Sequence, residues 1–102
     1  MAGDTNEVRS TIASTTGGVM CRGIGAVTGE LEVSTRRVPE GLEVAVRYAG
    51  AGEWYLVEGS PVPLDEDEDR SSEDLRELVE KRLTTPGEVV DGNEQPVSLV
   101  GF

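Results

Sequence analysis

Five consecutive carboxylates form the densest group of chemically active side chains in this sequence. They are Asp65, Glu66, Asp67, Glu68 and Asp69. Carboxylates in a short loop can bind calcium, but that loop requires a glycine at its sixth position and a bidentate glutamate at its twelfth. Counted from Asp65, the sixth position is Arg70, a cation. We therefore predict neither a metal nor a cofactor, and interpret the run as a solvated linker, with a docking surface for a basic partner as the alternative.

The other reactive residue types argue against an enzyme. The chain contains no histidine, so it lacks the usual general base at neutral pH and the imidazole ligands of metal sites. Cys21 has no histidine to pair with, and we interpret it as a small buried or half-buried thiol. Gly23, Gly25 and Gly29 depart by one position from dinucleotide-binding spacing and lead into a strand pattern. We predict a non-catalytic domain.

The net charge of −11 indicates which partners the chain attracts, and it is unevenly distributed. Residues 1–40 carry four arginines against five acids, a net charge of −1. Residues 41–102 carry five basic residues against fifteen acids, a net charge of −10. Such a field repels nucleic acid and anionic membranes and attracts basic proteins. We expect a basic protein partner, no nucleic acid and no membrane.

Length and cysteine content bound the class of protein. A chain of 102 residues suits one domain with a modest core. One cysteine excludes an intramolecular disulfide framework, and the sequence lacks a long apolar run or a signal-peptide pattern. These features predict a cytoplasmic protein. Lys81 is the only lysine, which indicates a GC-rich genome or adaptation to salt.

The element that must position these residues is a predicted antiparallel meander from Leu31 to Val57. Pro39 and Gly41 fit the second and fourth positions of a type I turn, and this turn fixes the first hairpin by counting outward. One face then carries the largely apolar pairs Thr35–Val44, Val33–Val46 and Leu31–Tyr48. The opposite face carries Arg36–Glu43, Ser34–Ala45 and Glu32–Arg47, two of which are opposite-charge pairs.

The second hairpin allows two registers. A three-residue loop from Gly50 to Gly52 places Trp54 on the apolar face and leaves Tyr55 and Val57 on the far face. A four-residue loop exchanges these roles and sets Glu43 against Glu58, so we favour the three-residue loop. In either register residues 54–57 are apolar on both faces. A second covering element or a partner must therefore contact them.

A helix is predicted at residues 72–84. Ser71 or Ser72 can cap it, and Pro86 and Gly87 follow its end. An apolar stripe recurs at helical spacing and comprises Leu75, Leu78, Val79 and Leu83. This stripe matches the apolar face of the meander, so we expect the helix to lie across the sheet.

The two ends of the chain are less regular. Residues 1–18 are predicted to be largely disordered, with a weak edge strand over 7–14 as the alternative. Residues 59–70 form a predicted acidic linker, because Pro61 and Pro63 end the preceding strand. The apolar C-terminal residues predict an edge strand at about 97–101, or a tail that inserts into a partner.

Together these patterns predict an α+β fold. Its antiparallel meander has three to four strands (about 24–37, 42–49 and 53–58), with one helix on one face, within a single domain of residues 19–102. The predicted function is a small interaction or regulatory domain that docks a basic protein. A self-assembling subunit that pairs through the sheet edge or the second sheet face is the alternative. The candidate partner-binding residues are Trp54, Tyr55, Val57, Asp65, Glu66, Asp67, Glu68 and Asp69.

Overall fold

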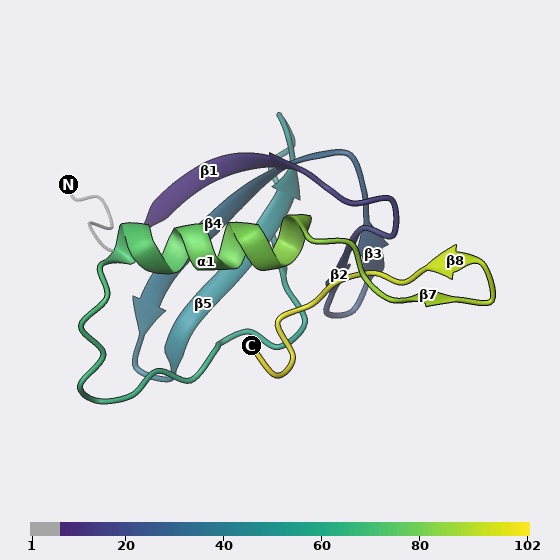
Figure 1. The fold of residues 1–102 in the computed structure, drawn as a ribbon. Helices are drawn as coiled ribbons and strands as arrows, with labels where there is room; N and C mark the ends of the chain where they lie inside the picture. The colour runs from purple at the N-terminus through teal and green to yellow at the C-terminus, as the bar shows by residue number, and fades with distance from the viewer. Residues whose placement is uncertain (1–6) are drawn as a thin grey trace.

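A four-stranded antiparallel sheet in the order β1-β4-β5-β6, with the helix α1 across one face, forms the body of the protein (Figure 1). The computed structural model describes residues 7–102 and has the α+β class that the sequence predicts. Two small sheets, β2-β3 and β7-β8, accompany this body. The elements are β1 (Val8–Ala13), β2 (Val19–Cys21), β3 (Gly25–Val27), β4 (Glu30–Val38), β5 (Gly41–Tyr48), β6 (Tyr55–Leu56), α1 (Ser72–Thr84), β7 (Val89–Val90) and β8 (Asn93–Glu94).

The β4–β5 hairpin has the predicted register, with Val33 opposite Val46. Because side chains alternate along a strand, this register gathers the apolar residues of both strands on one face. Gly41 ends the turn with a φ of 139°, and a Cβ there would run into the carbonyl oxygen of Val62, so the position requires glycine. The predicted ion pairs form on the other face: Arg36–Glu43 at 2.8 Å and Arg47–Glu32 at 3.0 Å.

The second hairpin has the register of the four-residue loop, so the prediction of a three-residue loop is wrong. Tyr55 lies opposite Val46. This register turns Tyr55 and Val57 toward the core and leaves Trp54 and Leu56 on the far face. The aromatic residues therefore exchange the roles that the sequence assigned to them.

The like-charge pair that counted against this register is not made in the ladder. β6 ends at Leu56, before Glu58 is reached. The N–H of Glu58 instead donates to the carbonyl oxygen of Met20 in β2 at 2.9 Å, and Cys21 bridges Val57. Pairing with β2, a tertiary contact that counting within one hairpin does not include, therefore removes the electrostatic objection.

The predicted long strand over residues 24–37 is interrupted. Gly25–Val27 belongs to β3, which pairs with β2, whereas the main-sheet strand β4 begins at Glu30. Gly25 and Gly29 have φ values of 86° and 106°, outside the extended region, which divides the segment. Gly25 thus begins β3, and Gly29 separates β3 from β4.

β1 forms the outer edge of the main sheet beside β4, with Ser10 opposite Val33. This strand corresponds to the edge-strand alternative for residues 7–14. The disorder expected for the first few residues concerns positions 1–6, which lie outside the described residues.

α1 has the predicted range of residues 72–84. Ser71 caps it, because its Oγ accepts a hydrogen bond from the Asp74 N–H at 3.0 Å. The helix packs on β1 and β4 of the sheet. Its side chains Leu75, Val79 and Leu83 are buried in the common core. Leu78, predicted as part of the same stripe, is 38% exposed.

The segment after β6 runs beside β5 before it turns to the helix. Leu42 and Val62 exchange two main-chain hydrogen bonds of 2.8 Å, and the Oγ of Ser60 accepts one from the Val44 N–H at 2.9 Å. The first part of the predicted linker therefore satisfies main-chain groups of β5 that β6 is too short to reach.

One β-bridge, between Val97 and Val19, and single main-chain hydrogen bonds replace the predicted C-terminal edge strand. The N–H of Val97 donates to the carbonyl oxygen of Gly18, and the N–H of Leu99 donates to that of Glu58, both at 2.8 Å. Val97 and Leu99 are buried, whereas Val100 and Phe102 are exposed. The apolar C-terminal residues are thus divided between core and surface.

Candidate protein-docking groove

A groove of about 420 Å³, with both apolar and charged side chains in its lining, lies between the first turns of α1, the segment after β6 and the C-terminal residues. Leu78 and Phe102 are 38% and 41% exposed beside it. We call it the acid-edged groove, because acidic residues join its apolar lining. The lining residues are Leu42, Val62, Pro63, Leu64, Asp65, Glu68, Arg70, Leu75, Leu78 and Phe102.

Glu68 is not a free carboxylate at this groove, because Arg70 binds both of its oxygens. The Nη2 of Arg70 donates to Oε1 at 2.6 Å, and its Nε donates to Oε2 at 2.7 Å. These hydrogen bonds lower the pKa of Glu68 to about 2. Arg37, near the end of β4, donates to the carbonyl oxygen of Arg70. The contact of Arg37 therefore ties the acidic run to the sheet. The prediction of a solvated linker does not hold for Glu68.

The other four carboxylates of the run are exposed, and no hydrogen bond or ion pair engages their carboxyl groups within residues 7–102. Besides the hydrogen bonds of Glu68, the charges of Asp69 and Asp65 also help to raise the pKa of Arg70, so Arg70 interacts with these two acids as well as with Glu68. The groove thus has one exposed carboxylate in its lining, that of Asp65, and three more follow it in the acidic run: Glu66, Asp67 and Asp69.

Trp54, the predicted aromatic anchor, lies on the sheet face away from the groove. Its ring is flanked by the guanidinium carbons of Arg47 at 4.6 Å and Arg9 at 5.3 Å from the ring centre. A hollow of about 350 Å³ beside the ring is lined by Glu7, Ser34, Arg36, Glu43, Ala45, Trp54 and Leu56. The structure therefore does not bring Trp54 and the acidic run together.

The other two predicted contact residues face inward. Val57 has no exposed surface, so it belongs to the core instead of the far face. Tyr55 is half-buried against the core, and its hydroxyl donates to the Oε1 of Glu53 at 3.1 Å. This hydrogen bond raises the pKa of Tyr55. The predicted site residues are thus divided between the groove, the far face and the core.

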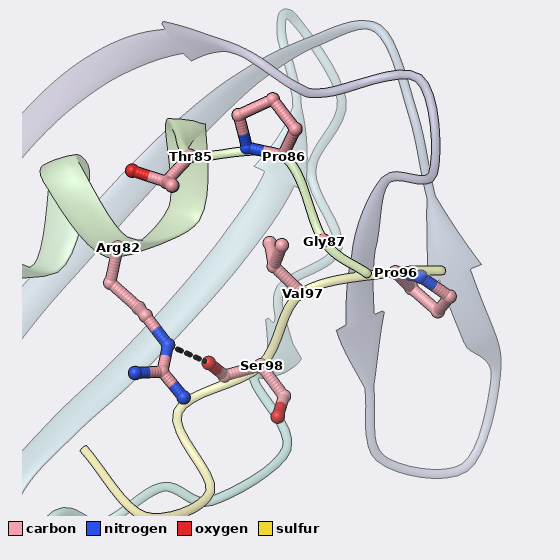
Figure 2. Close-up of a pocket in the computed structure, with 7 residues that line it drawn as sticks. All are labelled: Arg82, Thr85, Pro86, Gly87, Pro96, Val97 and Ser98. Carbon is pink, nitrogen blue, oxygen red and sulfur yellow. Dashed lines mark hydrogen bonds between the residues drawn. The ribbon is translucent and has the colours of Figure 1, made fainter. Parts of the chain in front are cut away.

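A second hollow, of about 350 Å³, lies where the end of α1 meets the C-terminal segment (Figure 2). The Nε of Arg82 donates to the carbonyl oxygen of Ser98, and its Nη2 donates to that of Val100, both at 2.9 Å. The hydroxyl of Thr85 donates to the carbonyl oxygen of Lys81 at 2.6 Å. These polar side chains hold main-chain groups, and Arg82 anchors the residues that lead into the wall of the groove.

Cys21 is not an activated thiol. It is 2% exposed, and burial raises its pKa to about 11, so it is protonated at neutral pH. Within the described part of the chain, no cluster of three or more His, Cys, Asp or Glu side chains is placed to hold a metal ion. In that same part, no helix has the length and apolar character needed to cross a membrane.

Comparison with known proteins gives no relative. No protein-family model matches the chain, and no curated protein or solved structure matches it significantly.

Sequence reasoning missed the apolar side chains that line this groove. Leu78 was assigned to the core stripe, Leu64 to the linker and Phe102 to a C-terminal strand or tail. One signal was available, because 100° per residue places Leu78 about 60° outside the arc from Leu75 to Leu83. Leu64 and Phe102 reach the groove because the chain reverses its direction. No periodic pattern in the sequence predicts such a reversal.

Proposed function

We propose that this protein is a non-catalytic interaction domain that docks a basic segment of a partner protein in the acid-edged groove. The supporting observation is that the groove combines exposed apolar side chains with the carboxylate of Asp65, at the start of a run with three further exposed acids. Apolar side chains of the partner would supply affinity by filling the groove. Its lysines and arginines would be steered and oriented by the carboxylates. The expected partner segment therefore carries both apolar and basic residues.

The roles within this site differ from those predicted from sequence. We assign steering to Asp65, Glu66, Asp67 and Asp69, and assign anchoring to the exposed pair Leu78 and Phe102, in place of the inward-facing Tyr55 and Val57. As part of the same proposal we place the domain in the cytoplasm. The buried, protonated thiol of Cys21 and the absence of a second cysteine in the sequence suit a reducing compartment.

The test is an NMR titration of the labelled protein with a synthetic amphipathic peptide of leucine and lysine. The variant that combines Glu66→Gln and Asp67→Asn should weaken binding about tenfold, from two exposed charge contacts of about 0.7 kcal/mol each. The matched control combines Glu88→Gln and Asp91→Asn, which removes two exposed charges from the β7-β8 hairpin. This control should bind the peptide nearly as well as the native protein.

Chemical-shift changes should concentrate at Leu64, Leu78 and Phe102. Equal weakening in the two charge variants would show general attraction to an acidic protein and contradict the groove as the site. Shift changes centred on Trp54 would also contradict it, because that ring lies on the other sheet face.

A further inference from the structure

The outer edge of β1 presents unpaired main-chain groups. The N–H of Ser14 donates to the carbonyl oxygen of Gly29 at 2.9 Å, which sets the phase of the β1–β4 ladder. Since hydrogen-bonding direction alternates along an antiparallel strand, the N–H and C=O groups of Arg9, Thr11 and Ala13 point away from the sheet. No described segment pairs with these groups, and β1 forms the margin of the sheet (Figure 1).

This edge also lacks the features that normally prevent pairing with another chain. β1 is six residues long and contains neither proline nor lysine. Val8, Thr11 and Ile12 are β-branched residues that favour strands. Its one charged side chain, Arg9, lies over the ring of Trp54. The edge is therefore able to accept another strand.

We propose that β1 pairs antiparallel with β1 of a second copy of this chain, about a two-fold axis at Ser10. The two four-stranded sheets would become one continuous sheet of eight strands. The outward N–H and C=O groups belong to odd-numbered residues. Each odd-numbered residue of one copy must therefore lie opposite an odd-numbered residue of the other copy. Arg9 then faces Thr11 of the second copy, and Val8 faces its Ile12. The core-side apolar residues of both copies thus meet across the new pair.

The side chain of Ser10 selects this register. Its Oγ is buried and has no hydrogen-bond partner within the described residues. At the two-fold axis each Ser10 faces the other in a non-hydrogen-bonded pair, where side chains lie closest. A change of χ1 rotamer would turn each covered Oγ toward the outer edge, where the two hydroxyls can bond to each other. A register centred on Thr11 would set Ser10 opposite Ile12 and leave the Oγ unsatisfied. The proposed axis therefore gives this buried hydroxyl a partner.

Charge also fits a second copy at this edge. Residues 1–40, which include β1 and β4, carry only −1 of the net charge of −11. Repulsion between two copies should therefore be weak where their β1 strands meet.

One pair of six-residue strands buries less area than a standard stable interface, so the dimer should depend on concentration. Disulfide trapping tests its register. Under mild oxidation Ser10→Cys should form a covalent dimer, because the two cysteines would lie directly opposite each other. Thr11→Cys should not, and the native protein measures any contribution from the buried Cys21. Cross-linking at position 11 alone, or at neither position, would overturn the proposal.

Sedimentation over a range of concentrations tests the pairing in the uncross-linked protein. Thr11→Pro removes an N–H that points outward, so it should keep the β1–β4 ladder and abolish the dimer. Thr11→Val keeps the N–H and should dimerise like the native protein. A native protein that stays monomeric at every concentration, even one that binds a foreign extended peptide, would overturn the proposal. Dimerisation of folded Thr11→Pro to the native extent would do the same, and if this variant fails to fold, the cysteine pair decides.

Discussion

At the scale of single residues, Arg70 explains how five adjacent carboxylates can be accommodated in one turn. The residue whose charge argues against a calcium loop is the one that binds Glu68 through both carboxylate oxygens. The side chain of Glu68 is only 9% exposed, so this pairing removes one charge from the surface of the run. The remaining four acids are exposed.

Glu68 should titrate near pH 2, and Arg70→Gln should return its pKa toward the ordinary value of 4.5. Because the fold lowers this pKa, the carboxylate stabilises the protein fully above about pH 4.5 and progressively less as the pH falls to 2. NMR of the side-chain carboxyl carbon measures the change. Arg82→Gln is the control, since that arginine binds main-chain carbonyl groups. A Glu68 pKa unchanged by Arg70→Gln would refute this cause.

The sequence identifies which residues belong to the acidic run but not which of them turns inward. In a strand or helix the side-chain direction follows a period, so Val33 and Leu75 could be assigned to the core in advance. The run lies in a turn, where the direction of Glu68 depends on the position of Arg70. That position is fixed partly by Arg37, which lies 33 residues earlier in the chain.

At the scale of elements, the two hairpins show when counting from a turn succeeds. For β4–β5 the turn residues, the apolar alternation and both ion pairs favour one register, and that register is present. For β5–β6 the apolar pattern fits either face, so the choice depended on one like-charge pair. The contact of Glu58 with β2 removes that pair. A local pattern therefore could not decide the second register.

The β6 register predicts losses of stability of different size at two neighbouring residues. Val57→Thr buries a hydroxyl in the core and should lower the free energy of unfolding by about 1–3 kcal/mol. Leu56→Gln places its amide in the open hollow beside Trp54 and should cost less than about 1 kcal/mol. Urea unfolding with an unchanged m-value measures both. A larger loss at position 56 would support the three-residue loop.

At the scale of the whole molecule, the class and the helix follow from the sequence, whereas the groove does not. α1 has a cap and a 3.6-residue apolar period in one segment, so its bounds could be read directly. The groove joins residues from β5, the turn before α1, α1 itself and the C-terminus. Its formation requires the C-terminal residues to return to the helix, where Arg82 holds them.

Salt should stabilise the protein, because most of its net charge of −11 lies in residues 41–102. Added NaCl screens the repulsion among these charges, while exposed ion pairs such as Arg36–Glu43 contribute little that screening could remove. A gain of about 1 kcal/mol would raise the melting temperature by about 5 °C in a domain of this size, which calorimetry at low and high salt can measure.

The acids of the run should contribute to this repulsion. The variant that combines Glu66→Gln and Asp67→Asn should therefore melt above the native protein at low salt and gain less from added NaCl. A melting temperature that falls with salt would show that the ion pairs outweigh the repulsion. If the melting temperature of this variant rises with salt as much as that of the native protein, Glu66 and Asp67 are excluded as a source of the repulsion. The expected result, greater stability with weaker peptide binding, would show that the groove keeps its charge at a cost to folding.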